Sequence, residues 1–310
     1  MYLRLSVTDQ CDFRCWYCRP AHQDTVAERA PHLDARSLLA LVSALHEVVG
    51  LHKIRFTGGE PLLRRDLADM VAALRSLLPD AELALTTNGL RLAERAASLR
   101  AAGLDRINVS LDSTDPRRFR QITGVDGFDR VRRGLHAARD AGFAEPKLNS
   151  VLLRTGGKTE LERLLTFAAE RQAELRFIEL MPFGLDAGDY AREFLAADDA
   201  FAMLAGLAHY QGALPESDTA ERHWFTHAGF DVVVGLIRSV SHPFCGRCDR
   251  LRLDARGQLR PCLRRRDHLD LSRLVERTGP ELATTLRDTL AGKQESTLRW
   301  PNLSMAAIGG

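Results

Sequence analysis

The sequence predicts an α/β fold, an open and partial (β/α)6 barrel of the TIM type with a C-terminal extension. Short strand-like runs alternate with amphipathic helical runs, a pattern typical of a parallel sheet with right-handed helical crossovers. Six strands are too few to close an eight-stranded barrel, so the predicted barrel is open. Segments rich in Gly, Asn and Cys follow the strands, at the edge where barrels carry their functional groups.

Each element is predicted from its local pattern. Asp34 is a typical N-cap for the first helix, and Gly103 favours the end of the third. The predicted strands cover residues 3–7, 53–57, 82–87, 106–111, 147–153 and 175–180. The predicted helices cover residues 34–49, 66–78, 91–102, 128–141 and 159–171. We divide the chain into a barrel core, residues 1–200, and a C-terminal region, residues 201–310.

Composition limits the classes of partner. The 310 residues include 43 basic and 41 acidic side chains, so a globally basic surface for nucleic acid is not indicated. No apolar run is long enough to span a membrane, and the first residues lack the pattern of a signal peptide. We therefore expect a cytoplasmic chain with reduced cysteines that binds neither nucleic acid nor membrane.

The six cysteines form two triads, which are Cys11-x3-Cys15-x2-Cys18 and Cys245-x2-Cys248-x13-Cys262. Three thiolates are one too few for a closed tetrahedral metal site. A cubane iron–sulfur cluster held by three cysteines keeps one iron open for another ligand. Two such sites predict redox chemistry on two bound small molecules.

Zinc is the alternative for the second triad, because His242 or His268 could supply a fourth ligand. The spacing of the first triad is unusual for zinc, since it places three thiolates in one tight loop. At this point both interpretations of the second triad stay open.

Further motifs follow the predicted strands, at residues 57–61, 86–89, 110–112 and 179–182. The pair Gly58-Gly59 lets a ligand approach the backbone closely. The carboxylate of Glu60 could accept a hydrogen bond from an ammonium group, although a tight turn explains Gly-Gly-Glu-Pro about as well.

The first triad, with Tyr17 before its last cysteine, resembles the signature of radical S-adenosylmethionine (SAM) enzymes. The resemblance covers nearly the whole chain and narrows to the GTP 3′,8-cyclase family of molybdenum cofactor biosynthesis. The segments that carry it are residues 3–9, 57–62, 85–89, 106–112, 176–181 and 244–252, together with the terminal Ile-Gly-Gly.

This resemblance implies two 4Fe-4S clusters and SAM as cofactors and GTP as substrate. The first cluster would be held by Cys11, Cys15 and Cys18, and the second, whose open iron binds guanine, by Cys245, Cys248 and Cys262. The implied SAM-binding residues are Tyr17, Gly58, Gly59, Glu60, Ser110 and Met181. The implied GTP-binding residues are Arg4, Arg55, Thr86, Lys147, Arg250 and Arg252. Arg250, Arg252, Gly309 and Gly310 are assigned to catalysis.

The residues themselves support the arginine assignments, because a planar fork of donors suits phosphate oxygens. The C-terminal region is then the part that holds the second cluster and GTP. For five further arginines we expect a solvated, salt-bridged loop instead; these are Arg256, Arg260, Arg264, Arg265 and Arg266.

The resemblance also implies a reaction and partners. A 5′-deoxyadenosyl radical takes the ribose 3′ hydrogen of GTP, and the sugar radical attacks guanine C8 to give 3′,8-cyclo-7,8-dihydroguanosine triphosphate. The product passes to a cyclic pyranopterin monophosphate synthase, and a flavodoxin- or ferredoxin-like reductant supplies the electrons. A homodimer is left open.

Some features depart from the family pattern. The chain begins almost at the first predicted strand, Gln10 stands where the family usually has Arg, and Asp12 where it usually has Asn. We expect these changes to remove positive charge and packing near the first cluster. They leave as an alternative a paralogue that acts on another substrate, such as a peptide. A more distant alternative is a non-catalytic module with zinc at both triads.

Overall fold

A computed structural model describes residues 1–19, 31–217, 219–265, 268–272, 284, 286, 287, 300 and 305. The strands are β1 Tyr2–Ser6, β2 Lys53–Thr57, β3 Glu82–Thr87, β4 Arg106–Ser110, β5 Lys147–Leu152, β6 Leu175–Glu179, β7 His209–Ser217, β8 Ala220–His227, β9 Phe230–Ile237, β10 Arg250–Leu253, β11 Gln258–Arg260 and β12 Leu269–Asp270. The helices are α1 Ala35–Val49, α2 Leu67–Leu77, α3 Leu92–Ala101, α4 Pro116–Thr123, α5 Phe128–Asp140, α6 Gly157–Arg171, α7 Ala187–Glu193 and α8 Ala197–Ala205.

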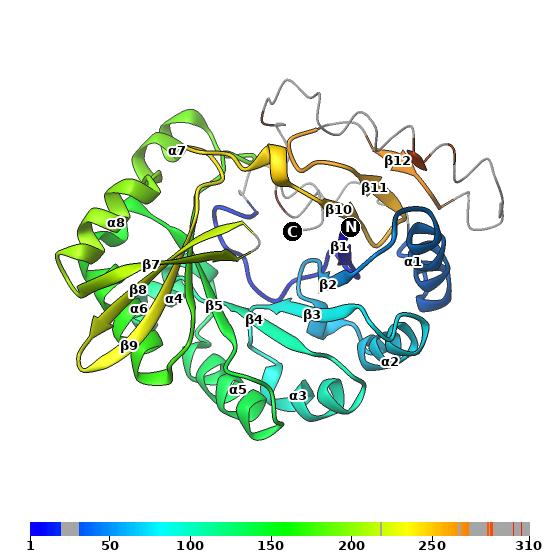
Figure 1. Cartoon of the computed structure of the whole chain (residues 1–310), viewed down its shortest axis with the longest axis horizontal. Helices are drawn as coiled ribbons and strands as arrows, with labels where there is room; N and C mark the ends of the chain where they lie inside the picture. Colours follow the sequence, from blue (N-terminus) through cyan, green and yellow to red (C-terminus); the bar gives the residue numbers. More distant parts are fainter. Residues whose placement is uncertain are drawn as a thin grey trace.

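The described strands form one open sheet of 12 strands in the order β12-β11-β10-β1-β2-β3-β4-β5-β6-β9-β8-β7. The strands β1 to β6 pair in parallel, each with the next. Figure 1 shows the sheet curved, with α1, α2, α3 and α5 along its outer side. The predicted open, partial barrel is therefore confirmed, and all six predicted strands form within a residue of their expected bounds.

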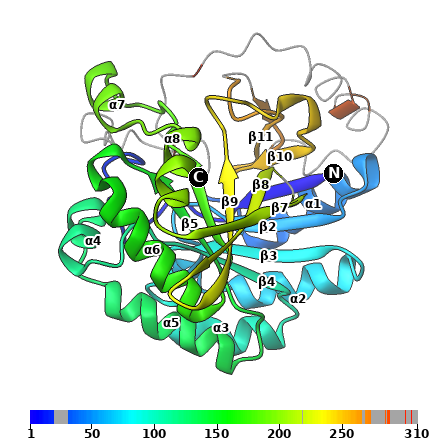
Figure 2. The same cartoon turned by 60° about the vertical axis from the view of Figure 1, so that its left-hand side comes forward.

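The C-terminal part of the chain extends this sheet at both edges. Strand β9 pairs in parallel with β6, and β10 pairs in parallel with β1. Figure 2 shows β7, β8 and β9 together at one edge. The sheet thus continues across the predicted domain boundary at residue 200, which stays a prediction. These later strands were not predicted, and neither were α4, α7 and α8.

Side-chain alternation gives the sheet an apolar outer face and a polar inner face. Leu3 and Leu5 of β1 and Ile54 and Phe56 of β2 are fully buried, in one core with the helix α1 side chains. The residues between them, such as Arg4, therefore point to the inside of the curve. The inner face of a barrel of this size is where ligands bind.

Helix ends match the capping rules that predicted them. Asp34 accepts a hydrogen bond from the Ser37 backbone N–H at 2.7 Å. Gly103, which follows the end of α3, has a left-handed conformation with φ 94°. Within the described part of the chain, no helix combines the length and the apolar character needed to cross a membrane.

Candidate functional site

The first cysteine triad lies in a loop at the C-terminal end of β1. The loop is tied to the end of α4, since Arg14 N donates to Thr123 O at 2.8 Å and Trp16 N to Ile122 O at 3.3 Å. A tight turn then follows, in which Cys18 N donates to Cys15 O at 2.9 Å. The helix that holds this loop was not predicted, although Asp115 before Pro116 is a typical helix start.

The glycines of the second motif admit this cysteine loop. Gly58 has φ 144°, and a Cβ built there would lie 2.3 Å from Thr8 O. A Cβ on Gly59 would lie 2.1 Å from Gln10 O. Gly59 N donates to Thr8 O at 2.7 Å and Glu60 N to Gln10 O at 2.6 Å. The close approach that these glycines permit in the structure is therefore backbone to backbone.

Glu60 is fully buried and joins the ends of β2 and β3. Its carboxylate accepts hydrogen bonds from Thr87 Oγ1 at 2.7 Å, Asn88 N at 2.7 Å and Leu62 N at 3.0 Å. Burial raises the pKa of Glu60 to about 7, although these three hydrogen bonds oppose the rise. The sequence suggested either a tight turn or a ligand contact for Glu60. In the structure its carboxylate holds the turn in place, and this does not conflict with a ligand contact by the same loop.

Tyr17 reaches from the cysteine loop to the end of β4. Its hydroxyl donates to Asp112 Oδ2 at 2.5 Å, and Asp112 Oδ1 accepts from Val151 N at 2.8 Å. Burial raises the pKa of both groups, and the proximity of the two raises that of Tyr17 further. Ser110 and Met181 come at or just after the ends of β4 and β6. The predicted SAM-binding residues thus lie at the C-terminal ends of the parallel strands.

The second cysteine triad lies at the opposite ends of the strands from the first. Cys245 and Cys248 precede β10, which runs parallel to β1, so they lie at the N-terminal ends of the parallel strands. Strand β11 returns antiparallel to β10, and Cys262 follows it at the same end of this hairpin. The length of the strands therefore lies between the two triads, and a five-residue strand such as β1 spans about 16 Å.

Arginines line the inner face between the triads. In register across four adjacent strands are Arg260 of β11, Arg252 of β10, Arg4 of β1 and Arg55 of β2. Arg250 and Lys53 lie two residues away along their strands and so share this face. Arg55 Nη1 donates to Thr86 Oγ1 at 3.3 Å. The predicted residues Arg4, Arg55, Thr86, Arg250 and Arg252 are thus brought together.

The electrostatics of this group favour an anion. Burial lowers the pKa of Arg252 well below its usual range, and repulsion from Arg4 and Arg250 lowers it further. Burial also lowers the pKa of Arg4, with Arg250 and Arg55 adding to the effect. Cations gathered in this way disfavour their own charged state, and a polyanion between them reverses the penalty.

Comparison with known proteins gives the family. A model of the Radical SAM superfamily matches residues 5–168, and one called Molybdenum Cofactor Synthesis C matches residues 173–298. A GTP 3′,8-cyclase of Rhodopirellula baltica is 37% identical, with 99% of this chain and 89% of that protein aligned. The chain belongs to the GTP 3′,8-cyclase family of the radical SAM superfamily.

Other relatives agree with this assignment. A GTP 3′,8-cyclase of Streptomyces coelicolor is 38% identical over 99% of this chain and 93% of its own length. The solved structure of Streptococcus suis SuiB bound to S-adenosylmethionine has a TM-score of 0.64 and 15% identity, covering 95% of this chain and 67% of that one. At this identity the likeness shows a radical SAM fold and nothing further.

The first triad fits the 4Fe-4S cluster that this superfamily carries. Burial raises the pKa of Cys11 to about 12 and that of Cys15 well above its usual range, with Asp112, Cys18 and Cys11 adding to the effect on Cys15. Such thiols become ligands when a bound metal centre displaces their protons. Among the described residues, no three His, Cys, Asp or Glu side chains converge on a single metal ion. A cluster does not need this convergence, because each cysteine binds a different iron.

The same observation bears on zinc at the second triad. Neither His242 nor His268 forms a three-membered metal-binding group with cysteines in the described part of the chain. His242 instead faces Asp198, with 3.9 Å between Nε2 and Oδ2. The contact with Asp198 therefore occupies His242, one of the two histidines that suggested zinc.

Lys147 lies farther round the barrel than the arginine row. Its Nζ is 2.8 Å from Glu174 Oε2, and Arg176 Nε is 2.6 Å from Glu174 Oε1. Arg176 and Lys53 share the inner face with the predicted cations but were not predicted. The signal that could have found Lys53 is its position two residues before Arg55 on one strand.

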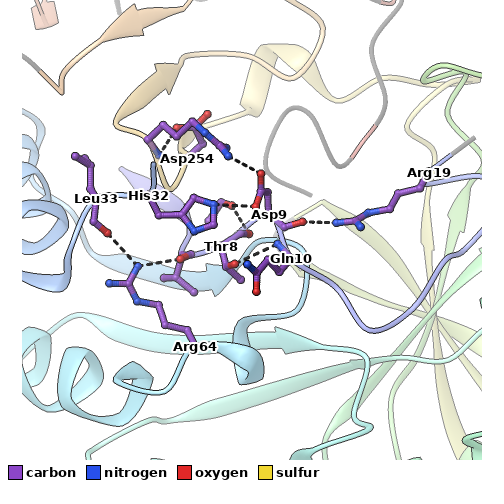
Figure 3. A network of polar contacts seen from close by, with 11 residues as sticks. Thr8, Asp9, Gln10, Arg19, His32, Leu33, Arg64 and Asp254 are labelled. Carbon is purple, nitrogen blue, oxygen red and sulfur yellow. Dashed lines mark hydrogen bonds and ion pairs between the residues drawn. The ribbon is translucent and has the colours of Figure 1, made fainter. Parts of the chain in front are cut away.

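A polar network joins the loop of the first triad to the turn after β10 (Figure 3). Asp9 Oδ2 is 2.6 Å from Arg256 Nη2, and Asp9 Oδ1 is 2.8 Å from His32 Nε2. The Asp9 and Arg256 side chains are each only 19% exposed. The expected salt-bridged loop is thus present at Arg256, but it is not solvated.

Two other expectations need correction. Arg260 is buried and in register with Arg252 rather than in a solvated loop, because residues 258–260 form a strand. Asp12 does not loosen the packing near the first triad, since its Oδ1 accepts from Asn88 Nδ2 at 2.7 Å and its Oδ2 lies 3.2 Å from Arg91 Nε. Gly309, Gly310 and Arg266 lie outside the described residues.

Proposed function

We propose that this chain converts GTP to (8S)-3′,8-cyclo-7,8-dihydroguanosine 5′-triphosphate, the first step of molybdenum cofactor biosynthesis. One observation carries the proposal beyond family membership, namely the arginine row between the two triads. Arg252, Arg4 and Arg55 are neighbours across three adjacent strands on the inner face. A triphosphate is the kind of ligand that such a row of forked donors recognises.

The position of the triads supports a proposed direction for GTP. The first triad lies at the C-terminal ends of the strands and the second at their N-terminal ends. We propose that Cys245, Cys248 and Cys262 hold a second 4Fe-4S cluster whose open iron takes the guanine. The triphosphate then contacts Arg4, Arg55, Arg250 and Arg252, with Thr86 and Lys147 beside it, and the ribose faces the SAM site.

The chain's own contribution is to bind and orient. When bound, the first cluster and SAM supply the hydrogen-atom abstraction from the ribose. Tyr17, Gly58, Gly59, Glu60, Ser110 and Met181 are proposed to form the SAM site, and the Glu60 hydrogen bonds keep its loop fixed. Holding both substrates in one orientation is the main catalytic task.

The remaining expectations extend the proposal. The barrel core over 1–200 would hold the first cluster and SAM, and the region 201–310 the second cluster and GTP. A flavodoxin- or ferredoxin-like reductant and a downstream cyclic pyranopterin monophosphate synthase follow from the reaction. Gly309 and Gly310 are proposed to act in catalysis on the resemblance alone.

A peptide-modifying radical SAM enzyme is the competing proposal. An extended peptide is held mainly through backbone hydrogen bonds and side-chain pockets, and it has no need of a row of closely spaced guanidinium groups. The inner face near β1 instead carries Arg4, Arg55, Arg250 and Arg252. This charge pattern favours a nucleotide.

Turnover under anaerobic conditions tests the proposal. Reconstituted protein is incubated with GTP, SAM and dithionite, and the products are separated by chromatography with mass detection. One hydrogen is lost at the ribose and one is regained, so the product has the mass of GTP and a different retention. We expect it in amounts equal to 5′-deoxyadenosine. Deoxyadenosine formed without any GTP isomer would contradict the proposal.

A further inference from the structure

Tyr2 lies at the centre of the cationic inner face, and no role has so far been given to it. The side chain is buried. Arg55 Nε donates a hydrogen bond to Tyr2 Oη at 2.6 Å, and the Arg4 side chain hydrogen-bonds to the same phenol. Thus two of the guanidinium groups assigned to the triphosphate already share one oxygen acceptor.

The ring of Tyr2 contacts cations from two neighbouring strands. Lys53 Nζ lies 5.1 Å from the ring centroid, Arg250 Cζ 5.5 Å and Arg55 Cζ 5.9 Å. Cations within about 6 Å of an aromatic ring are attracted to its π-face, and more strongly when both are desolvated. The phenol therefore offsets part of the repulsion among these groups when no anion is bound.

We propose that Tyr2 is a positioning residue for the triphosphate. Its ring and hydroxyl hold the surrounding cations in place before the nucleotide arrives, and its oxygen competes with phosphate oxygens for the same guanidinium groups. This inference rests on the proposed function, because the competing ligand is the triphosphate of the substrate.

The competition has a consequence for protonation. Burial alone would raise the pKa of Tyr2, but attraction to Arg55, Arg4 and Arg250, with the Arg55 hydrogen bond, lowers it to about 8. The charged groups that face Tyr2 are Arg4 of β1, Lys53 and Arg55 of β2, Arg250 and Arg252 of β10, and Glu82 of β3, which pairs with Lys53.

A bound triphosphate places several negative charges among the same cations. These charges disfavour a phenolate beside them, so the pKa of Tyr2 returns toward its usual value of about 10. Above about pH 8, binding must then take up a proton at Tyr2. Between about pH 7 and about pH 9 this coupling weakens binding on the order of tenfold.

Calorimetry on the reconstituted holoenzyme tests the inference. The ligand is inorganic tripolyphosphate, which lacks the ionisable guanine. Titrations at about pH 7 and about pH 9, each in two buffers of different ionisation enthalpy, give affinity and the number of protons taken up. The same titrations on Tyr2→Phe, which keeps the ring and removes the hydroxyl, subtract the protonation of the ligand itself.

We expect the wild type to take up nearly one proton more than Tyr2→Phe at about pH 9, and to lose about tenfold more affinity between the two pH values. Loss of tyrosinate ultraviolet absorbance on binding, absent in the variant, provides a second readout. Binding at neutral pH, together with equal proton uptake by the two proteins at about pH 9, overturns the role of Tyr2 and leaves the proposed function intact. Failure of both GTP and tripolyphosphate to bind at neutral pH overturns the two together.

Discussion

Arg4 on β1 and Arg252 on β10 are register partners in a parallel sheet, although they come from opposite ends of the sequence. Arg55 on β2 is the partner of Arg4 on its other side. Three guanidinium groups in a row repel one another and are partly desolvated, which the lowered pKa of Arg252 reflects. A bound polyanion offsets this repulsion, so this pairing is the strongest structural argument for a triphosphate substrate.

Replacement of Arg252 by methionine should separate binding from folding. A charge-assisted hydrogen bond contributes about 1.5 to 3 kcal/mol, so Arg252→Met should weaken GTP binding about ten- to a hundredfold. Because the lost charge was buried among like charges, the nucleotide-free protein should be at least as stable as the wild type in thermal unfolding. Arg120→Met, at an exposed position of α4, is the matched control. Normal GTP affinity in Arg252→Met would assign this arginine a purely structural role.

Iron analysis should distinguish the two triads. Wild-type protein reconstituted anaerobically should hold about eight irons, and Cys15→Ala should keep about four while losing all cleavage of SAM. Cys248→Ala should also keep about four irons but retain some cleavage of SAM, because its triad lies at the N-terminal ends of the parallel strands, away from the first triad. A protein that binds two zinc ions and no iron would end this account.

Glu179 should stabilise the segment that leads to the second triad, although it is not itself a proposed ligand. Its buried carboxylate accepts from Val240 N and Ser241 N, each at 2.8 Å, from Ser241 Oγ at 2.6 Å and from Ala197 N at 3.0 Å. It thus attaches the segment that leads to Cys245 to the end of β6.

Glu179→Ala leaves these donors without their acceptor, at a cost of about 1 to 3 kcal/mol for each one that stays buried. We expect lower stability and loss of about half the iron, with cleavage of SAM retained. Glu179→Gln keeps an oxygen acceptor and should lose less. Full iron content in a folded Glu179→Ala protein would show that the second triad does not depend on this carboxylate.

Ionisation of Tyr2 should also change how the free energy of unfolding depends on pH. Its pKa is lowered from the usual 10.0 to about 8 in the folded protein, so the unfolded chain binds more protons between these values. The free energy of unfolding of the wild type should therefore rise relative to Tyr2→Phe between about pH 8 and about pH 10, by about 2 to 3 kcal/mol. Below about pH 8 this contribution disappears.

Tyr190 provides the control for this measurement. Burial, with the nearby Glu179, raises its pKa to about 12. Tyr190→Phe should therefore show no gain in wild-type stability over the same pH window, since a raised pKa gives the opposite sign at higher pH. Parallel pH profiles for the two variants would contradict the assignment of Tyr2.

Much of the barrel could be predicted because its first six strands are local patterns. Residues 53–57 and 82–87 were predicted with their observed bounds, since each is a short strand-like segment between two amphipathic helical patterns. The strands β10 and β11 were not predicted. Their segments, Arg-Leu-Arg-Leu and Gln-Leu-Arg, are only four and three residues long, so their alternation is too short to predict strands. The strand β10 is placed by its pairing with β1, and β11 by its pairing with β10.

The candidate site was predictable in chemistry but not in arrangement. The cysteines and the paired glycines can be recognised from their spacing in the sequence. The triads lie at opposite ends of the parallel strands because β10 runs parallel to β1. This pairing joins segments from the two ends of the sequence, and no local pattern encodes it. Tyr2 lies outside the motifs named from the sequence, and its place on the inner face follows only from the register of neighbouring strands. Arg176 opens the segment 176–181, but that segment does not show that its side chain shares the inner face; the register of β5 and β6 does.

One isotope measurement tests the central claim, that GTP lies between the triads with its ribose toward SAM. GTP deuterated at C3′ is incubated anaerobically with SAM, dithionite and the reconstituted enzyme, and the 5′-deoxyadenosine is analysed by mass. The account predicts one deuterium in each deoxyadenosine formed, and none from GTP deuterated at the guanine C8. Deoxyadenosine that carries no deuterium from C3′ while the GTP is consumed would contradict it.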